Sequence, residues 1–254
     1  MISLAGKAAV ITGGSRGIGA ATVRLFASAG ADVVFSFRQD RESARQVEQD
    51  AKKHGTRVES FRADLRRMAD ARKLLEFASE RVGHVDILVA NAGIWNAEGV
   101  PIQSMSEQQW DEMARSNSKS FYSVAHYAVP QMIERRSGRI IVISSTAGQR
   151  GEPFHSHYAA TKGAAISFVK SLAAELAPHN ILVNAVAPGW VTTDMSKPVL
   201  ESRSGRKLAL TQIPLGRPAT PDEIAGPILF LASDLATFVT GEILNVNGGS
   251  VLCG

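Results

Sequence analysis

The chain has 254 residues, of which 44% are hydrophobic and 20% are charged, with a formal net charge of +4 at pH 7. This balance is typical of one soluble α/β domain whose core needs no disulfide or metal support, and the one cysteine, Cys253, excludes a disulfide framework and a cysteine metal cluster. The basic residues alternate with acidic ones and no aromatic platform accompanies them, so nucleic acid is not an expected partner. Without a signal peptide before the first strand or an apolar run of about 18 residues, we expect a cytoplasmic protein with no membrane span.

Short continuous apolar runs alternate with longer segments of helical pattern along the chain. The runs occupy residues 8–11, 33–35, 87–89, 140–143, 181–183 and 243–246. Because strands covered by helices on both faces are apolar throughout, these runs predict parallel strands. Helices are expected between them, at residues 17–28, 41–53, 67–81, 107–135, 156–177 and 222–232. The alternation predicts a single domain over residues 1–254, an α/β doubly wound Rossmann fold with a parallel sheet of about seven strands flanked by helices on both faces.

A glycine-rich turn joins the first predicted strand to the first predicted helix. It reads Thr12-Gly13-Gly14-Ser15-Arg16-Gly17-Ile18-Gly19. Glycines let the backbone turn tightly and approach a pyrophosphate, and the start of the helix offers free N–H groups and the positive end of its dipole. In this context the turn predicts a dinucleotide-binding site.

Tyr158 and Lys162 are four residues apart on a predicted helix, so their side chains share one face. An isolated tyrosine has a pKa near ~10, which makes it a poor acid–base catalyst at neutral pH. A neighbouring ammonium favours the phenolate, so Lys162 is expected to lower the pKa of Tyr158. Taken alone, such a pair is more often a core tyrosine beside a solvated lysine, and the rest of the chain decides for catalysis.

The motifs together resemble those of the short-chain dehydrogenase/reductase family along the whole chain. They are Thr12-Gly13-x-x-x-Gly17-x-Gly19, Asn91-Ala92-Gly93, Asn117, Ser145, Tyr158-x-x-x-Lys162, Pro188-Gly189-x-Val191-x-Thr193, Thr240-Gly241-Glu242 and Val246-Asn247-Gly248-Gly249. The overall pattern is most similar to 3-oxoacyl-[acyl-carrier-protein] reductases. The resemblance implies NADP(H)-dependent reduction of a carbonyl to an alcohol, possibly of a 3-oxoacyl thioester.

The resemblance also implies a role for each catalytic residue. Tyr158 would donate a proton to the carbonyl oxygen as hydride arrives, and Ser145, rather than its neighbour Ser144, would hydrogen-bond that oxygen. Lys162 would bind the nicotinamide ribose and lower the tyrosine pKa. Asn117 would break its helix locally and hold a water that links Lys162 to solvent.

For the cofactor, the resemblance implies contacts along the carboxyl ends of the strands. Asp64 and Leu65 would contact the adenine, while the Val191 backbone and the Thr193 hydroxyl would hold the carboxamide. The implied cofactor-binding residues are Gly13, Ser15, Arg16, Gly17, Ile18, Gly19, Arg38, Asp64, Leu65, Asn91, Ala92, Gly93, Tyr158, Lys162, Pro188, Gly189, Val191 and Thr193.

The end of the second strand decides between NAD and NADP. An acid about twenty residues after the glycines normally holds the ribose hydroxyls of NAD, and Asp40 lies near that window. In this family the deciding position is the strand tip, which we place at Phe37; no carboxylate stands there, and Arg38 follows. Arg16 and Arg38 would suit a 2′-phosphate, because arginine makes bidentate, charge-assisted contacts with phosphate. We therefore expect NADP(H).

Residues 194–217 are expected to form a mobile lid over a pocket near which Trp95, Glu152, His155 and Trp190 lie. A carrier-protein-linked substrate calls for a basic patch beside the pocket, for which the candidates are Arg135, Arg136 and Arg139. An NAD(P)-dependent alcohol, sugar or steroid dehydrogenase is an alternative, and a catalytically silent dinucleotide-sensing protein is an alternative of another class. Small residues on the long helices suit close packing within the fold or between subunits, and the family resemblance favours a homotetramer or homodimer. No metal site is predicted.

Overall fold

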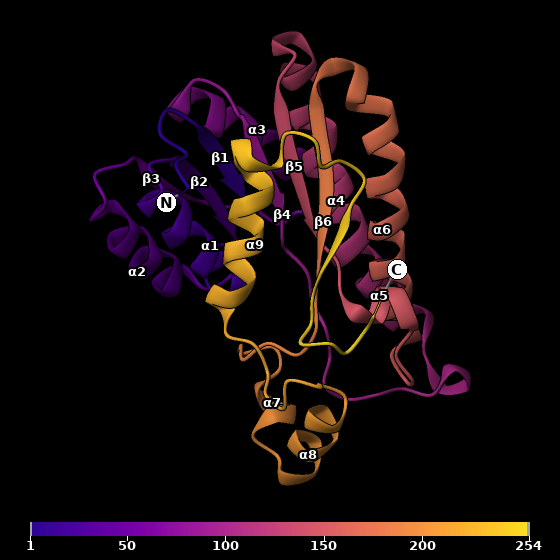
Figure 1. The fold of residues 1–254 in the computed structure, drawn as a ribbon. Helices are drawn as coiled ribbons and strands as arrows, with labels where there is room; N and C mark the ends of the chain where they lie inside the picture. Colours follow the sequence, from indigo (N-terminus) through magenta and orange to yellow (C-terminus); the bar gives the residue numbers. More distant parts are fainter. Residues whose placement is uncertain (1, 253–254) are drawn as a thin grey trace.

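A computed structural model describes residues 2–252, so Cys253 lies outside the described residues. Its sheet has the strand order β3-β2-β1-β4-β5-β6-β7, and every pair of neighbours is parallel. The order reverses between β1 and β4, the position where ligands bind in such sheets (Figure 1). The strands are β1 (Ala8–Ile11), β2 (Asp32–Phe37), β3 (Val58–Arg62), β4 (Ile87–Ala90), β5 (Gly138–Ile143), β6 (Ile181–Pro188) and β7 (Ile243–Val246).

Helices follow the strands, as the alternating pattern predicts. The α-helices are α1 (Gly17–Ser28), α2 (Arg41–Lys52), α3 (Met68–Val82), α4 (Glu107–Arg135), α5 (Thr146–Arg150), α6 (Ser156–Leu176), α7 (Lys197–Leu200), α8 (Arg203–Thr211) and α9 (Pro221–Ala232). The described residues also form the 3₁₀ turns η1 (Ile102–Ser104), η2 (Ala177–His179) and η3 (Asp234–Ala236). Among residues 2–252, no helix is both long enough and apolar enough to cross a membrane.

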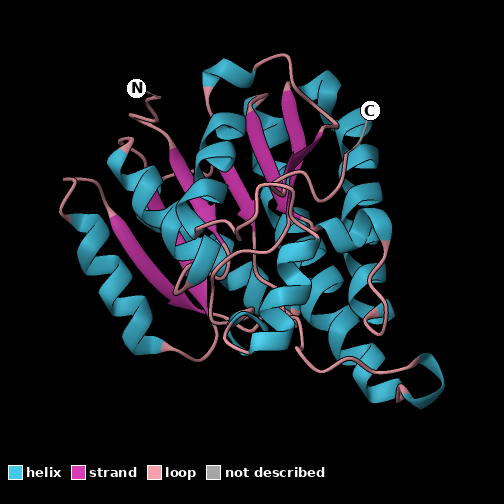
Figure 2. Ribbon diagram, turned by 60° about the horizontal axis from the view of Figure 1, so that its bottom comes forward, coloured by secondary structure: helices cyan, strands magenta, loops and turns pink. Residues whose placement is uncertain are grey.

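Helices cover both faces of the sheet (Figure 2). A hydrophobic core lies under each layer of helices. Neighbouring residues of a strand point to opposite faces, so Phe35 of β2 packs into the core beneath α1, α2 and α9, while Val34 packs beneath α3, α4 and α6. Both side chains are fully buried. Most positions of the central strands therefore carry apolar side chains, and the parallel sheet between two layers of helices confirms the doubly wound Rossmann fold.

The apolar runs do not predict β3, which is the edge strand beside β2. Its sequence, Val58-Glu59-Ser60-Phe61-Arg62, has only two apolar residues, and of these five residues only Val58 is fully buried. A search for continuous apolar runs detects strands covered on both faces and misses a strand that is partly open to solvent.

Residues 194–217 contain α7 and α8, which project from the carboxyl edge of the sheet (Figure 1). Ala209 of α8 is buried, whereas Leu208 beside it is 64% exposed. This segment therefore occupies the position predicted for a lid, at the carboxyl edge of the sheet, and it forms two helices.

Candidate active site

Two cavities lie side by side at the carboxyl edge of the sheet. The larger has a volume of about 580 Å³ and the smaller about 280 Å³. Both are lined by Ile18, Asn91, Gly93, Ile94, Thr193 and Met195. These shared walls join the start of α1, the turn after β4 and the start of the lid, so one elongated ligand can extend from one cavity into the other.

Ser145, Tyr158 and Lys162 line the larger cavity. Tyr158 lies in the first turn of α6, and Lys162 follows one helical step later, with its Nζ 5.7 Å from the centre of the tyrosine ring. Ser145 directly precedes α5, one residue beyond Ser144 at the end of β5, and hydrogen-bonds the Tyr158 side chain. Three of the four side chains predicted to be catalytic therefore line one cavity.

Burial controls the titration of both Tyr158 and Lys162. It raises the pKa of Tyr158 to about 12; the hydrogen bond with Ser145 opposes this rise and the Glu152 carboxylate adds to it. It also lowers the pKa of Lys162 to about 8. The expected lowering of the tyrosine pKa by Lys162 is not found in this protein: burial of the phenol dominates, and the Lys162 Nζ donates to the Ile143 carbonyl at 2.8 Å. At neutral pH Tyr158 carries its proton.

Lys162→Met is expected to change how folding stability depends on pH. The pKa of Lys162 is about 8 in the folded protein and 10.5 ordinarily, so the unfolded chain binds more protons between these values. Wild-type stability therefore gains from this group as pH rises through that window, and the variant lacks the gain. Urea unfolding should show that the free energy of unfolding of the wild type, relative to that of the variant, rises by about 2 kcal/mol from pH 7 to pH 10.

The control for this comparison is Lys170→Met, which removes an exposed lysine from the same helix. Its stability relative to wild type should change little between the two pH values. If the free energies of unfolding of wild type and Lys162→Met differed by the same amount at both pH values, the burial of the Lys162 amine would be contradicted.

Ser144 and Ser145 have different hydrogen-bond partners, and the difference favours Ser145 as the catalytic serine. The Ser144 hydroxyl is buried and donates to the Lys162 carbonyl at 2.9 Å, so it ties β5 to α6. The Ser145 hydroxyl accepts from the Ala147 N–H at 3.1 Å and contacts the tyrosine. Ser145 is the serine available to a substrate oxygen.

Asn117 is buried in α4 and holds the loop that follows β4. Its Oδ1 accepts from the Ile94 N–H at 2.7 Å, and its Nδ2 donates to the Ile94 carbonyl and to the Thr161 hydroxyl, each at 3.0 Å. A Cβ built on Gly93 would lie 3.0 Å from Asn117 Oδ1 and 3.6 Å from Lys162 Nζ, so these groups converge behind that glycine. The predicted local break is wrong, because α4 continues through Asn117.

The glycine turn is packed against the end of β4. The Thr12 hydroxyl accepts from the N–H groups of Asn91 and Ala92 at 2.9 Å, and Asn91 Nδ2 donates to the Thr12 carbonyl at 2.9 Å. Gly13 has a φ of 67°, in the left-handed region that favours glycine. A Cβ on Gly19 would lie 2.2 Å from the Gly13 carbonyl oxygen, so only glycine fits there.

Gly19→Ala is expected to weaken dinucleotide binding by about tenfold or more and to lower the Tm by several degrees. The added methyl must displace the turn backbone, and forced overpacking costs about 1–3 kcal/mol. Gly226→Ala is the control, because nothing lies within 4 Å of the place that its new methyl group would take in α9, and alanine favours helices. Calorimetry and NADPH fluorescence measure both effects; equal behaviour of the two variants would contradict the packing of this turn.

The smaller cavity lies at the end of β2, the position predicted to decide between NAD and NADP. β2 ends at Phe37, as expected, and Arg38 lines the cavity together with Arg16. Asp40 accepts from the Ser43 N–H at 2.9 Å and from its hydroxyl at 2.7 Å, which lowers the pKa of this carboxyl. Asp40 therefore caps α2, although it lines the same cavity as Arg16 and Arg38.

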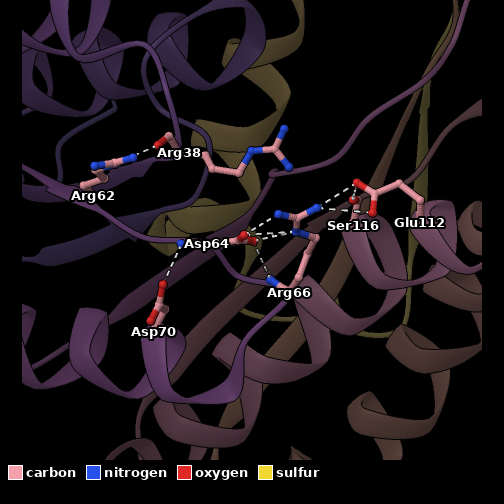
Figure 3. A network of polar contacts seen from close by, with 7 residues as sticks. All are labelled: Arg38, Arg62, Asp64, Arg66, Asp70, Glu112 and Ser116. Atoms are coloured by element: carbon pink, nitrogen blue, oxygen red, sulfur yellow. Dashed lines mark hydrogen bonds and ion pairs between the residues drawn. The ribbon is translucent and has the colours of Figure 1, made fainter.

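Sequence reasoning missed Arg66, which also lines the smaller cavity. Its guanidinium bonds both Asp64, with Nε 2.8 Å from Oδ1, and Glu112 of α4, with Nη1 2.9 Å from Oε1 (Figure 3). The contact with Arg66 lowers the pKa of Asp64, and Arg38 lowers it further. The sequence feature that could have identified Arg66 as a site residue is its position directly after Asp64-Leu65, at the carboxyl end of β3.

Most of the residues predicted to bind the cofactor line a cavity. The smaller is lined by Gly13, Ser15, Arg16, Gly17, Ile18, Arg38, Asp64, Leu65, Asn91, Ala92, Gly93 and Thr193. Tyr158, Lys162, Pro188, Gly189 and Val191 line the larger. Gly19 and Asn117 are not among the lining residues of either cavity and act through the backbone they pack against.

The prediction of a basic patch beside the pocket is wrong. Arg135, Arg136 and Arg139 lie at the end of α4 and the start of β5, the opposite edge of the sheet from Ser145. Arg135 pairs with Asp86 at 3.0 Å and Arg136 donates to a backbone carbonyl. Burial lowers the pKa of Arg139. The four residues expected near the pocket, Trp95, Glu152, His155 and Trp190, do line the larger cavity.

Known proteins resemble this chain over nearly its whole length. Residues 13–250 match the profile of a family described as enoyl-(acyl carrier protein) reductase. The chain is 40% identical over 248 residues to a 3-oxoacyl-[acyl-carrier-protein] reductase FabG of Aquifex aeolicus, with 98% of each chain covered. It is 38% identical over 249 residues to the protein of the same description from Thermotoga maritima, covering 98% of this chain and 99% of that one.

Solved structures agree with this likeness. A structure described as a putative short-chain alcohol dehydrogenase from Sinorhizobium meliloti superimposes with a TM-score of 0.93 at 33% identity, covering 98% of this chain and 97% of that one. A short-chain type dehydrogenase/reductase from Mycobacterium marinum superimposes with a TM-score of 0.92 at 31% identity, covering 99% and 98%.

Proposed function

The chain belongs to the short-chain dehydrogenase/reductase family, and we propose that it reduces a 3-oxoacyl thioester to the 3-hydroxyacyl thioester with NADPH. The observation that carries the proposal is the juxtaposition of Tyr158, Ser145 and Lys162 in a cavity that adjoins a second, arginine-lined one. An acid, a hydrogen-bond donor and a cation in one cavity beside a second cavity suit hydride transfer to a carbonyl.

The smaller cavity fits a dinucleotide phosphate. No side chain caps the start of α1, and its first turn contains no acidic residue, so its N–H groups are available to a pyrophosphate. Arg16 and Arg38 would hold the 2′-phosphate, and Asp64 and Leu65 would contact the adenine. Val191 and Thr193 would hold the carboxamide. When bound, the nicotinamide supplies the hydride.

Ser145 and Tyr158 would bind the carbonyl oxygen of the substrate through their hydroxyl groups. The pKa of Tyr158, about 12, keeps it protonated, so it can deliver a proton as negative charge develops on that oxygen. The amine of Lys162, with a pKa of about 8, would bind the ribose and can take up and release a proton near neutral pH. Asn117 would keep this amine connected to solvent through a water.

The acyl substrate is proposed from the relatives and from the charge of the lid. Two relatives are named as 3-oxoacyl-[acyl-carrier-protein] reductases. Exposed Arg203, Arg206 and Lys207 lie on α8, whose Leu208 and Ala209 line the larger cavity. These cations would attract an acidic carrier protein to the mouth of the cavity.

The test is NADPH oxidation with a panel of 3-oxoacyl thioesters, sugars, steroids and simple ketones. Continuous turnover with thioesters, at a kcat/KM above that for the other classes, is expected. Preference for a sugar or steroid would replace the substrate class, and binding of NADPH without turnover on any carbonyl would support a dinucleotide sensor instead. The complete Ser145, Tyr158 and Lys162 set favours an enzyme.

We also propose a single-domain, cytoplasmic homotetramer. Ala160, Ala164 and Ser167 are exposed along one side of α6, where small side chains allow close packing of a second subunit. Light scattering that gives the mass of a monomer would contradict the assembly.

A further inference from the structure

Arg66, which no step of the proposed reaction uses, bridges the smaller cavity and α4. Its guanidinium holds the Asp64 carboxylate at two points, with Nε 2.8 Å from Oδ1 and Nη2 bonded to Oδ2 (Figure 3). Its Nη1 lies 2.9 Å and 3.2 Å from the two carboxylate oxygens of Glu112. Because a planar guanidinium whose three nitrogens all bond carboxylates has little freedom to rotate, Arg66 fixes the direction in which the Asp64 carboxylate points.

The other parts of this bridge are held as well. The Ser116 hydroxyl, one turn further along α4, donates to Glu112 Oε1 at 3.2 Å, and Ser116 is buried. The Asp64 N–H donates to Asp70 Oδ2 in the first turn of α3 at 3.0 Å, so the backbone of Asp64 is fixed too. The Arg66 and Glu112 side chains are 34% and 43% exposed, and an ion pair so open to solvent adds little stability. The main consequence of the bridge is therefore the orientation of Asp64.

Arg66 leaves Asp64 with room to accept one more hydrogen bond. A carboxylate has about four lone pairs. Oδ1 accepts from Arg66 Nε at 2.8 Å and from the Arg66 backbone N–H at 3.2 Å, whereas Oδ2 accepts from Nη2 and shares the Nε proton at 3.0 Å. Within residues 2–252, no other residue donates to this carboxylate, and Arg38 acts on its charge without a hydrogen bond. A lone pair of Oδ2 is thus available to a ligand in the cavity that Asp64 lines.

The wall around Asp64 is otherwise largely apolar. Its chain neighbours Ala63 and Leu65 are buried and line the smaller cavity, and so do Ala92 and Ile94 from the loop after β4. A flat base with an N–H donor on its edge fits apolar walls that carry a fixed acceptor, because its faces lose contact with water while its donor keeps a partner.

We propose that Arg66 is a positioning residue that makes the cofactor site selective for adenine, by aiming one oxygen of Asp64 at the exocyclic amine of the base. The inference rests on the proposed function and concerns the base of the dinucleotide rather than the reacting end. Hypoxanthine carries a carbonyl oxygen where adenine carries the amine. It therefore turns an acceptor toward the Asp64 carboxylate, which has no proton to donate.

The experiment measures the dissociation constants of NADPH and of its hypoxanthine analogue by fluorescence titration, for wild type and for Arg66→Met. Methionine keeps an unbranched side chain and removes the guanidinium. Wild type should bind NADPH about tenfold or more tightly than the analogue, because the analogue loses a hydrogen bond to a charged group. In Arg66→Met the Asp64 carboxylate is free to turn toward water, so this preference should fall by about threefold or more. The kcat at saturating NADPH should not change.

Arg67→Met is the matched control, since it removes the same charge from an exposed neighbour that lines neither cavity. It should keep the wild-type preference. A second comparison introduces Arg66→Met into Asp64→Ala, where it should no longer change the preference, because Arg66 acts through that carboxylate. A merely structural role of Arg66 would weaken the binding of both dinucleotides equally and leave the preference unchanged.

The outcomes separate this inference from the proposed function. If wild type turns over NADPH but binds both dinucleotides equally, or if Arg66→Met keeps the wild-type preference, the inference is wrong and the proposed function stands. An equal effect of Arg66→Met with and without Asp64 would also overturn the inference, since Arg66 would then act on the base directly. If wild type neither binds NADPH nor reduces any carbonyl, the proposed function fails and the inference fails with it.

Discussion

Tyr158→Phe is expected to lower kcat for ketone reduction by about 10²–10⁴-fold, the range found when a positioned general acid is removed. The variant keeps the ring that packs beside Lys162 and loses only the hydroxyl that contacts Ser145. NADPH affinity, measured by fluorescence titration, should change little. Because the pKa of Tyr158 is about 12, the wild-type rate of reduction should not follow the ionisation of a phenol between pH 6 and 9.

Tyr122→Phe is the matched control, since Tyr122 is an exposed tyrosine on α4. It should retain wild-type activity. Should Tyr158→Phe keep more than about a tenth of wild-type kcat, another group must supply the proton and the assignment of Tyr158 as general acid fails.

Arg38→Asp is expected to reverse the cofactor preference. The wild type should favour NADPH over NADH in kcat/KM, because Arg38 and Arg16 line the cavity that would receive the 2′-phosphate. Aspartate at the end of β2 removes one of these contacts, repels the phosphate and offers a carboxylate to the ribose hydroxyls of NADH. The ratio of kcat/KM values should shift toward NADH on the order of 100-fold.

Arg41→Asp makes the same change of charge three residues away, on an exposed position of α2 that lines neither cavity. Any effect of net charge on NADPH binding appears equally in both variants, whereas a contact with the 2′-phosphate appears only in Arg38→Asp. A tenfold preference of the wild type for NADH would reject the NADP(H) assignment outright.

The architecture could be predicted from the sequence because each rule used for the prediction involves residues that are close together in the chain. Continuous apolar runs identify strands buried on both faces, and the split of Val34 and Phe35 between the two cores shows why. The glycine turn is likewise local, since Gly19 is required by contact with Gly13 only six residues away. Tyr158 and Lys162 share a helix, so their spacing alone places them on one face.

Properties that depend on several segments were beyond sequence reasoning. The pKa of Tyr158 rises because burial outweighs its neighbours, which spacing along a helix does not reveal. Arg66 reaches Glu112 across 46 residues of sequence to bridge the smaller cavity and α4. Arg139 is close in sequence to Ser145 but lies at the other end of the same strand, so proximity in sequence suggested the wrong edge of the sheet.

The crystal structure of the complex with NADP⁺ tests the central claim most directly. We expect the nicotinamide in the larger cavity, with its reactive face toward the Tyr158 hydroxyl and its ribose bonded to Lys162. The 2′-phosphate should lie between Arg16 and Arg38 in the smaller cavity. A nicotinamide bound elsewhere, or a Tyr158 hydroxyl directed away from it, would contradict the proposed reductase.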